Sequence, residues 1–92
     1  IMELYGADML TLFSAFQIDK GRHARGYVAK AKAFSAETVG RVMDVGSQIF
    51  GGMGVVSGVI VERLYREIRA LRIYEGTSEI QKLVIAGQAM GA

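Results

Sequence analysis

The chain contains no cysteine and no proline, and its 92 residues include one histidine. The absence of cysteine excludes disulfide bridges, thiolate metal ligands and thiol nucleophiles. The absence of proline removes the residue that most strongly interrupts helices, so long helices are possible. The histidine, His23, is expected in a turn beside Gly21 and Arg22. The sequence therefore predicts no metal site.

Excess charge is also scarce, because the formal net charge is only +2. This small value is weak support for a nucleic-acid partner. Glu3 and Asp8 interrupt the first apolar stretch, which argues against a membrane-spanning helix and a secretory leader there. We expect no nucleic-acid partner, no membrane partner, and a location in the cytoplasm, or in the mitochondrial matrix of a eukaryote.

Hydrophobic residues, in contrast, make up 51% of the chain. A chain of this length can bury one core, so we expect residues 1–92 to form a single domain. Ile1 already stands inside a helical pattern, with no N-cap residue before it. We therefore expect this domain to be truncated on its N-terminal side.

Four amphipathic segments have helical periodicity, and no segment shows the alternation of a strand. They cover about 1–19, 24–50, 59–73 and 78–90. Short glycine-containing turns separate them, and the sequence predicts an all-α fold, an up-down-up-down bundle of four helices.

The first segment is apolar on nearly every side. Its polar positions form one narrow stripe that is expected to face water: Asp8, Thr11, Ser14 and Gln17. Such a helix is buried on more than one side, so we expect further helices or subunits to cover it.

The first of two glycine-containing motifs is QIFGGMG, residues 48–54. An ordinary link between two helices would explain its glycines without any ligand. It is not a dinucleotide-binding fingerprint, because no strand precedes it. The alternative is that bare backbone at Gly51 and Gly52 approaches a phosphate group.

The second motif is RIYEGTSEIQ, residues 72–81, which places Glu75 between two helical segments. A surface carboxylate in a turn is the default interpretation of such a residue. Ile73 and Tyr74, however, predict that the turn packs inward, and Gly76 leaves room for a ligand to approach. Thr77 or Ser78 is expected to cap the following helix.

Both motifs resemble the C-terminal helical domain of the acyl-CoA dehydrogenases, flavoproteins that desaturate acyl-CoA thioesters. The stretch VERLYREIRALRIYEGTSEIQKLVIA, residues 61–86, is similar to that family almost residue for residue, and a looser likeness runs back through AKAFSAETVGRVMDVGSQIFGG, residues 31–52. The resemblance implies FAD as cofactor and an acyl-CoA as substrate. It also implies a homo-oligomer, a tetramer or a dimer, and an electron-transfer flavoprotein as partner.

The resemblance further assigns roles to residues. It makes Glu75 the base that takes the α-proton, with Tyr74 and Gly76 at the substrate. The thioester oxygen is held by the N–H of Glu75 and a flavin ribityl hydroxyl, and a hydride passes to flavin N5. The positions expected to contact FAD are Gln48, Ile49, Phe50, Gly51 and Gly52, in a neighbouring subunit, together with Thr77, Ser78 and Glu79.

Some branches of the family carry their base on another helix, so Glu75 favours the branch that uses this position. Gly58 and Ile60 stand where many relatives have an acid and a proline, which leaves the acyl-chain preference open. The domains that would hold the flavin ring are not in these residues, and we expect the chain alone to be inactive. Two other functions remain open: a helical module that assembles subunits without chemistry, and a DNA-binding relative, which the small charge disfavours.

Overall fold

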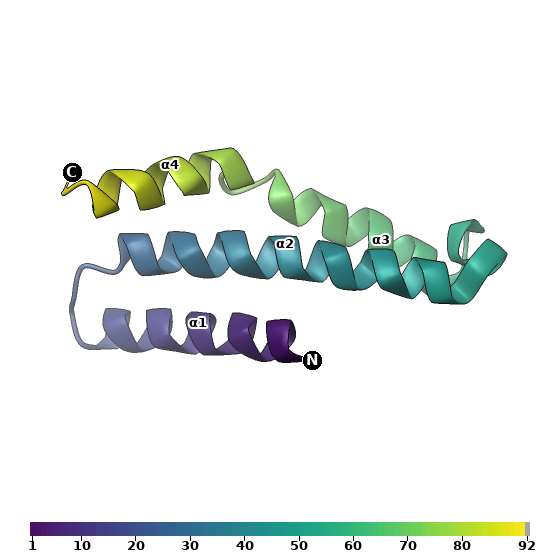
Figure 1. Cartoon of the computed structure of the whole chain (residues 1–92), viewed down its shortest axis with the longest axis horizontal. Helices are drawn as coiled ribbons and strands as arrows, with labels where there is room; N and C mark the ends of the chain where they lie inside the picture. The colour runs from purple at the N-terminus through teal and green to yellow at the C-terminus, as the bar shows by residue number, and fades with distance from the viewer. Residues whose placement is uncertain (92) are drawn as a thin grey trace.

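The computed structural model describes residues 1–91, and all regular structure in this range is helical (Figure 1). Four α-helices and two 3-10 turns follow one another: α1 (Met2–Asp19), α2 (Arg25–Phe50), η1 (Gly51–Val55), α3 (Ile60–Arg69), η2 (Ala70–Arg72) and α4 (Ser78–Ala89). The all-helical class and the four helices predicted from the sequence are confirmed.

Helix α2 is the centre of the arrangement (Figure 1). Helix α1 runs antiparallel to it on one side, and α3 and α4 follow one another along the other side. The chain reverses between α1 and α2 and again between α2 and α3, whereas it only bends between α3 and α4. The 26 residues of α2 span about 39 Å, so that α3 and α4, with 10 and 12 residues, fit along it end to end.

The molecule is therefore elongated. Its principal extents are 48 × 22 × 18 Å and its radius of gyration is 15.5 Å. A compact chain of this length would have a radius of gyration of about 12 Å. In this arrangement α2 is covered on two sides, whereas α1, α3 and α4 each pack mainly against α2 and leave their outer faces uncovered.

Small side chains make up the buried part of the helix contacts. The buried apolar residues are Ala7, Ala24, Ala29, Ala31, Ala33, Ala36 and Val61. Alanines on facing stripes let two helix backbones approach closely. Large apolar residues point the other way; Phe13 and Phe16 are both 47% exposed. The chain therefore leaves many large apolar residues exposed on its outer surface.

Only half of the polar stripe of α1 faces water as the sequence predicted, because Asp8 and Thr11 are exposed whereas Ser14 and Gln17 are not. Ser14 and Gln17 are both buried, while the aromatic residues of α1 are exposed. The Ser14 hydroxyl donates to the carbonyl of Leu10 at 2.8 Å, and the Gln17 Oε1 accepts a hydrogen bond from Arg22 at 3.3 Å. Because these local bonds satisfy the polar atoms, small and polar residues can pack against the alanines of α2.

Candidate functional site

The bend of residues 73–77 joins η2 to α4, and hydrogen bonding in the first turn of α4 fixes the point at which the bend ends. The Oγ1 of Thr77 accepts the N–H of Ile80 at 3.2 Å, so Thr77 is the N-cap. The backbone N–H groups of Ser78 and Glu79 have no partner in the described part of the chain. The start of α4 thus carries a cap and two free donors.

Within the bend, Glu75 has an unusual backbone conformation. Its φ is 55°, and it is the only non-glycine residue among residues 1–91 with a positive φ. Gly76 follows with a φ of 90°. A Cβ atom in the left-handed region costs roughly 1–2 kcal/mol, so surrounding contacts must impose this conformation.

Two side chains from neighbouring helices supply those contacts. The ammonium of Lys32, on α2, donates to the carbonyl of Gly76 at 2.6 Å. The amide Nε2 of Gln81, on α4, donates to the carbonyl of Glu75 at 3.1 Å. The backbone of the bend is therefore held by side chains on both flanks rather than by a helical ladder.

A third anchor joins the start of α4 to α2. The hydroxyl of Ser78 donates to Oε1 of Glu37 at 2.7 Å, and Arg72 lies 3.6 Å from the other oxygen of Glu37. The hydrogen bond from Ser78, aided by the guanidinium of Arg72, holds the pKa of the Glu37 carboxyl below its ordinary value, against the opposing effect of burial. Ser78 thus ties the N-terminus of α4 to the middle of α2.

The side chain of Glu75 is exposed on this chain. Ile73 and Tyr74 are 56% and 52% exposed, so the expected inward packing of the turn does not occur within residues 1–91. The reason is the anchoring just described: α2 contacts the carbonyl side of the bend, and these side chains lie on the flank that α2 leaves free. The N–H of Glu75 has no partner among these residues and can donate to a ligand.

The motif at residues 48–54 forms the end of α2 and the start of η1. Gln48, Ile49, Phe50, Gly51 and Gly52 are all exposed. A Cβ atom added at Gly51 or Gly52 would meet nothing within 4 Å, whereas at Gly54 it would meet the backbone of Ser47. Packing in this chain therefore explains Gly54, and the positive φ of 62° explains glycine at position 51, whereas neither explains Gly52.

The two motifs lie far apart. Ser78 contacts Glu37, and Gln48 and Gly51 lie 11 and 14 residues further along α2. At 1.5 Å per residue, the two parts are separated by roughly 16–21 Å. The structure brings Tyr74, Glu75, Gly76, Thr77, Ser78 and Glu79 together, and it places the residues of the 48–52 stretch elsewhere.

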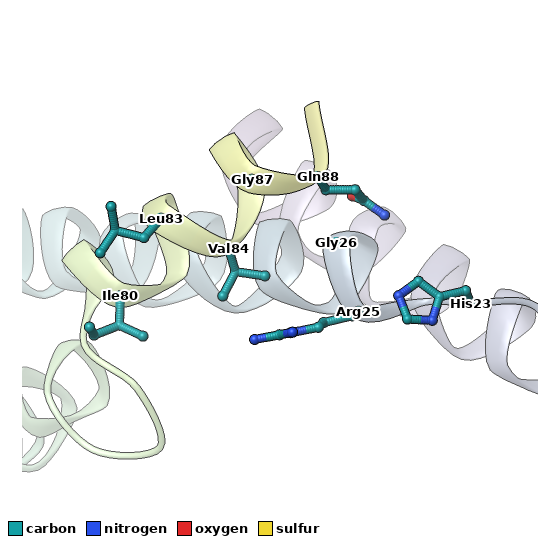
Figure 2. A pocket seen from close by; sticks show the side chains of 8 residues that line it. All are labelled: His23, Arg25, Gly26, Ile80, Leu83, Val84, Gly87 and Gln88. Carbon is teal, nitrogen blue, oxygen red and sulfur yellow. The ribbon is translucent and has the colours of Figure 1, made fainter. Parts of the chain in front are cut away.

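One open pocket lies beyond the bend, where the start of α2 meets α4 (Figure 2). It has a volume of about 370 Å³. Val84 and Leu83 of α4 contribute apolar side chains, and His23 and Arg25 contribute polar ones. Sequence reasoning did not find this pocket, because it depends on which turn of α4 meets α2.

Sequence reasoning also missed the anchors Lys32, Glu37 and Gln81. Lys32 and Glu37 act across 44 and 41 residues, and nothing in a single sequence indicates such pairings. In residues 1–91, no group of three His, Cys, Asp or Glu could hold a metal ion. No helix of the described chain combines the length and apolar character needed to cross a membrane.

The fold defines an all-helical domain in which one long central helix anchors an acidic bend. Residues 1–90 match the family described as acyl-CoA dehydrogenase, C-terminal domain, and the chain belongs to this family. The acyl-CoA dehydrogenases use FAD.

Two curated relatives and one solved structure illustrate the likeness. The chain is 40% identical over 89 residues to the mitochondrial short-chain specific acyl-CoA dehydrogenase of Rattus norvegicus, covering 97% of this chain and 22% of that protein. It is 39% identical over 88 residues to a 3-(aryl)acrylate reductase of Clostridium sporogenes, covering 96% and 23%.

The structure is similar, with a TM-score of 0.93 and 26% identity, to a chain from a study titled "Electron transferring flavoprotein of Acidaminococcus fermentans: Towards a mechanism of flavin-based electron bifurcation". That match covers 99% of this chain and 24% of the other. The chain thus spans about a quarter of the length of the proteins it matches.

Proposed function

We propose that this domain supplies the catalytic base, Glu75, to an FAD-dependent acyl-CoA dehydrogenase that desaturates acyl-CoA thioesters at the α and β carbons. The observation that carries the proposal is the left-handed backbone of Glu75. Strained residues that neighbouring side chains hold in place are concentrated at functional sites. Here the strain falls on the one acid that the family resemblance makes the base.

The proposed chemistry uses two groups of Glu75. Its carboxylate takes the proton from the carbon next to the thioester carbonyl. Its N–H, which has no partner among residues 1–91, donates to the thioester oxygen and stabilises the negative charge that develops there. Tyr74 and Gly76 flank the substrate, and FAD, when bound, accepts the hydride from the β-carbon.

The residues expected at FAD fit such a group in two places. At the start of α4, the cap residue Thr77 and the free N–H groups of Ser78 and Glu79 suit the polar part of the cofactor. At the end of α2, Gly51 and Gly52 offer bare, open backbone. The separation of roughly 16–21 Å along α2 supports the assignment of Gln48, Ile49, Phe50, Gly51 and Gly52 to the cofactor of a neighbouring subunit.

The exposed apolar surface supports a homo-oligomer, a tetramer or a dimer, of the longer protein. Exposed residues as large as Phe13, Phe16 and Leu12 need cover in a stable assembly. We propose an electron-transfer flavoprotein as redox partner, because a relative that is 34% identical is named as subunit CarC of a caffeyl-CoA reductase-Etf complex of Acetobacterium woodii. We also propose a mitochondrial or, in a bacterium, a cytoplasmic location.

A second candidate is the reverse reaction, reduction of a carbon–carbon double bond. It is favoured by relatives named as reductases, at 39% and 34% identity. In this direction the protonated Glu75 would give its proton to the α-carbon, and reduced FAD, when bound, would supply the hydride to the β-carbon. Assays of the full-length enzyme in both directions, with an acyl-CoA and with an arylacrylyl-CoA, distinguish the two.

The test of the base is Glu75→Gln in the full-length, FAD-loaded protein. Rapid mixing with a saturated acyl-CoA should show flavin reduction slowed by about 10²- to 10⁴-fold, because a general base contributes about this much. FAD should stay bound, as its visible absorbance reports. Glu67→Gln is the matched control, since Glu67 is an exposed acid on α3 with one long ion pair, 3.7 Å, to Arg63. Flavin reduction at the wild-type rate in Glu75→Gln would leave the non-catalytic assembly module as the function.

A further inference from the structure

Lys32 makes a contact with the bend that neither helix geometry nor the proposed chemistry requires. Its ammonium donates to the carbonyl of Gly76 at 2.6 Å, across 44 residues of sequence. A hydrogen bond from a charged donor is shorter and roughly twice as strong as a neutral one. The acceptor is the carbonyl next to the strained residue, Glu75, so the bond acts directly on the backbone that carries the base.

The path of the Lys32 side chain shows that the contact is built into the packing. Lys32 is half-buried and lines an apolar groove between α1 and α2, beside Val28, Ala36 and Leu71. Its methylene stem can lie along these apolar groups while the ammonium reaches past them to the bend. Burial of the stem restricts the ammonium to fewer positions than an exposed lysine has, so less freedom is lost in forming the bond.

The bend offers few other restraints at this point. The backbone hydrogen bonds around it end with the N–H of Tyr74, which donates to Ala70, and start again with the N–H of Gln81, which donates to Thr77. Between these positions, the carbonyl of Glu75 accepts a hydrogen bond from Gln81. The carbonyl of Gly76 accepts one from Lys32 at 2.6 Å and a longer one, at 3.5 Å, from Gln81. Lys32 is the charged one of these two donors.

We propose that Lys32 is a positioning residue for Glu75. By holding the Gly76 carbonyl, it keeps the Glu75–Gly76 backbone left-handed and fixes the place from which the Glu75 carboxylate takes the substrate proton. This inference rests on the proposed function of Glu75. A purely structural role, in which Lys32 only pins α4 to α2, would affect stability without a specific effect on the chemical step.

The experiment compares Lys32→Met, which keeps the apolar stem and removes the donor, with Lys32→Arg, which keeps a charged donor. In the full-length, FAD-loaded protein, the limiting rate of flavin reduction at saturating acyl-CoA should fall about 10- to 100-fold in Lys32→Met, since a misplacement of about 1 Å can cost this much. The half-saturating acyl-CoA concentration should change little, and Lys32→Arg should recover most of the rate.

A second measurement determines the backbone conformation of Glu75 directly. Crystal structures of the two variants should show Glu75 outside the left-handed region in Lys32→Met and inside it in Lys32→Arg. The matched control is Lys30→Met, which removes an exposed lysine of the same helix whose ammonium lies over the ring of Tyr27. If Lys32→Met does not fold, Lys32→Gln, which is too short to reach Gly76 but keeps a polar group, takes its place.

The outcomes separate this inference from the proposed function. A wild-type limiting rate in Lys32→Met overturns the positioning role, as does a Lys32→Arg variant as slow as Lys32→Met. If Glu75→Gln, measured alongside, reduces flavin normally, the proposed function fails instead. A slow Glu75→Gln together with a normal Lys32→Met would support Glu75 as the base and exclude Lys32 as its positioning residue.

Discussion

Replacement of Glu75 by glycine and by alanine tests the strained bend directly. Both substitutions remove the carboxylate, and they differ only in the Cβ atom. At most positions alanine is the more stabilising of the two, because glycine loses about 0.5–1 kcal/mol more in backbone entropy on folding. The φ of 55° at Glu75 predicts the opposite order there.

The size of the effect follows from two opposing terms. A Cβ atom in the left-handed conformation costs roughly 1–2 kcal/mol, and glycine avoids this cost. After subtraction of the entropic loss of about 0.5–1 kcal/mol, Glu75→Gly should be more stable than Glu75→Ala by roughly 0.5–1 kcal/mol. Both variants should lose flavin reduction, and only Glu75→Gly, which also removes the strain, should lose activity while gaining stability.

Glu67 supplies the matched control, because it is also an exposed glutamate but lies inside α3. Glu67→Gly should be less stable than Glu67→Ala by about 1 kcal/mol. The two sites should therefore differ by about 1.5–2 kcal/mol in the effect of glycine relative to alanine. Thermal melting curves of the full-length variants, followed by circular dichroism at equal concentration, measure this difference in stability. A Glu75→Ala variant more stable than Glu75→Gly would refute the left-handed bend.

Two further predictions concern the anchors of the bend. Thr77→Ala should lower stability by about 1 kcal/mol through loss of the cap on the N–H of Ile80, and Thr77→Ser should restore it; equal melting temperatures for all three proteins would contradict this. Because the pKa of Glu37 is lowered in the folded chain, the stability it contributes is present at neutral pH and is lost as the pH falls through that lowered value. Melting curves of wild type and Glu37→Gln should therefore differ at neutral pH and converge in acid, and a difference that grows on acidification would be inconsistent with the Ser78 contact.

Helical periodicity was enough to predict the four helices, since it depends on residues three and four apart. Which face of each helix packs inward depends on contacts between helices, and here the usual rule failed. In α1, Ser14 and Gln17 are buried while Phe13 and Phe16 are exposed. A pattern of large apolar residues predicts the core of a complete fold, whereas this chain packs through its alanines and leaves the large residues outside.

The site shows the same limit of sequence reasoning. Gly76 and a cap at Thr77 or Ser78 could be predicted from local sequence, because a bend and a helix start have local signatures, and the structure identifies Thr77 as the cap. The left-handed conformation of Glu75 could not, because glutamate is not a residue that prefers positive φ. It depends on Lys32 and Gln81, and the lysine lies 44 residues before the carbonyl it binds.

A division of roles follows from the exposure of Glu75 together with its fixed backbone. A carboxylate in water is well solvated and is a weak base toward carbon, and removal of that water makes it a stronger base. This chain does not remove the water, since Ile73, Tyr74 and Glu75 are all exposed on it. It does fix the direction of approach, through Lys32, Gln81 and the link from Ser78 to Glu37. Under the proposed function, this domain sets the position of the base, and the surface that covers the bend sets the strength of the base. Changes in the covering surface should therefore alter the pH dependence of flavin reduction. Changes in the anchors should alter the limiting rate of flavin reduction.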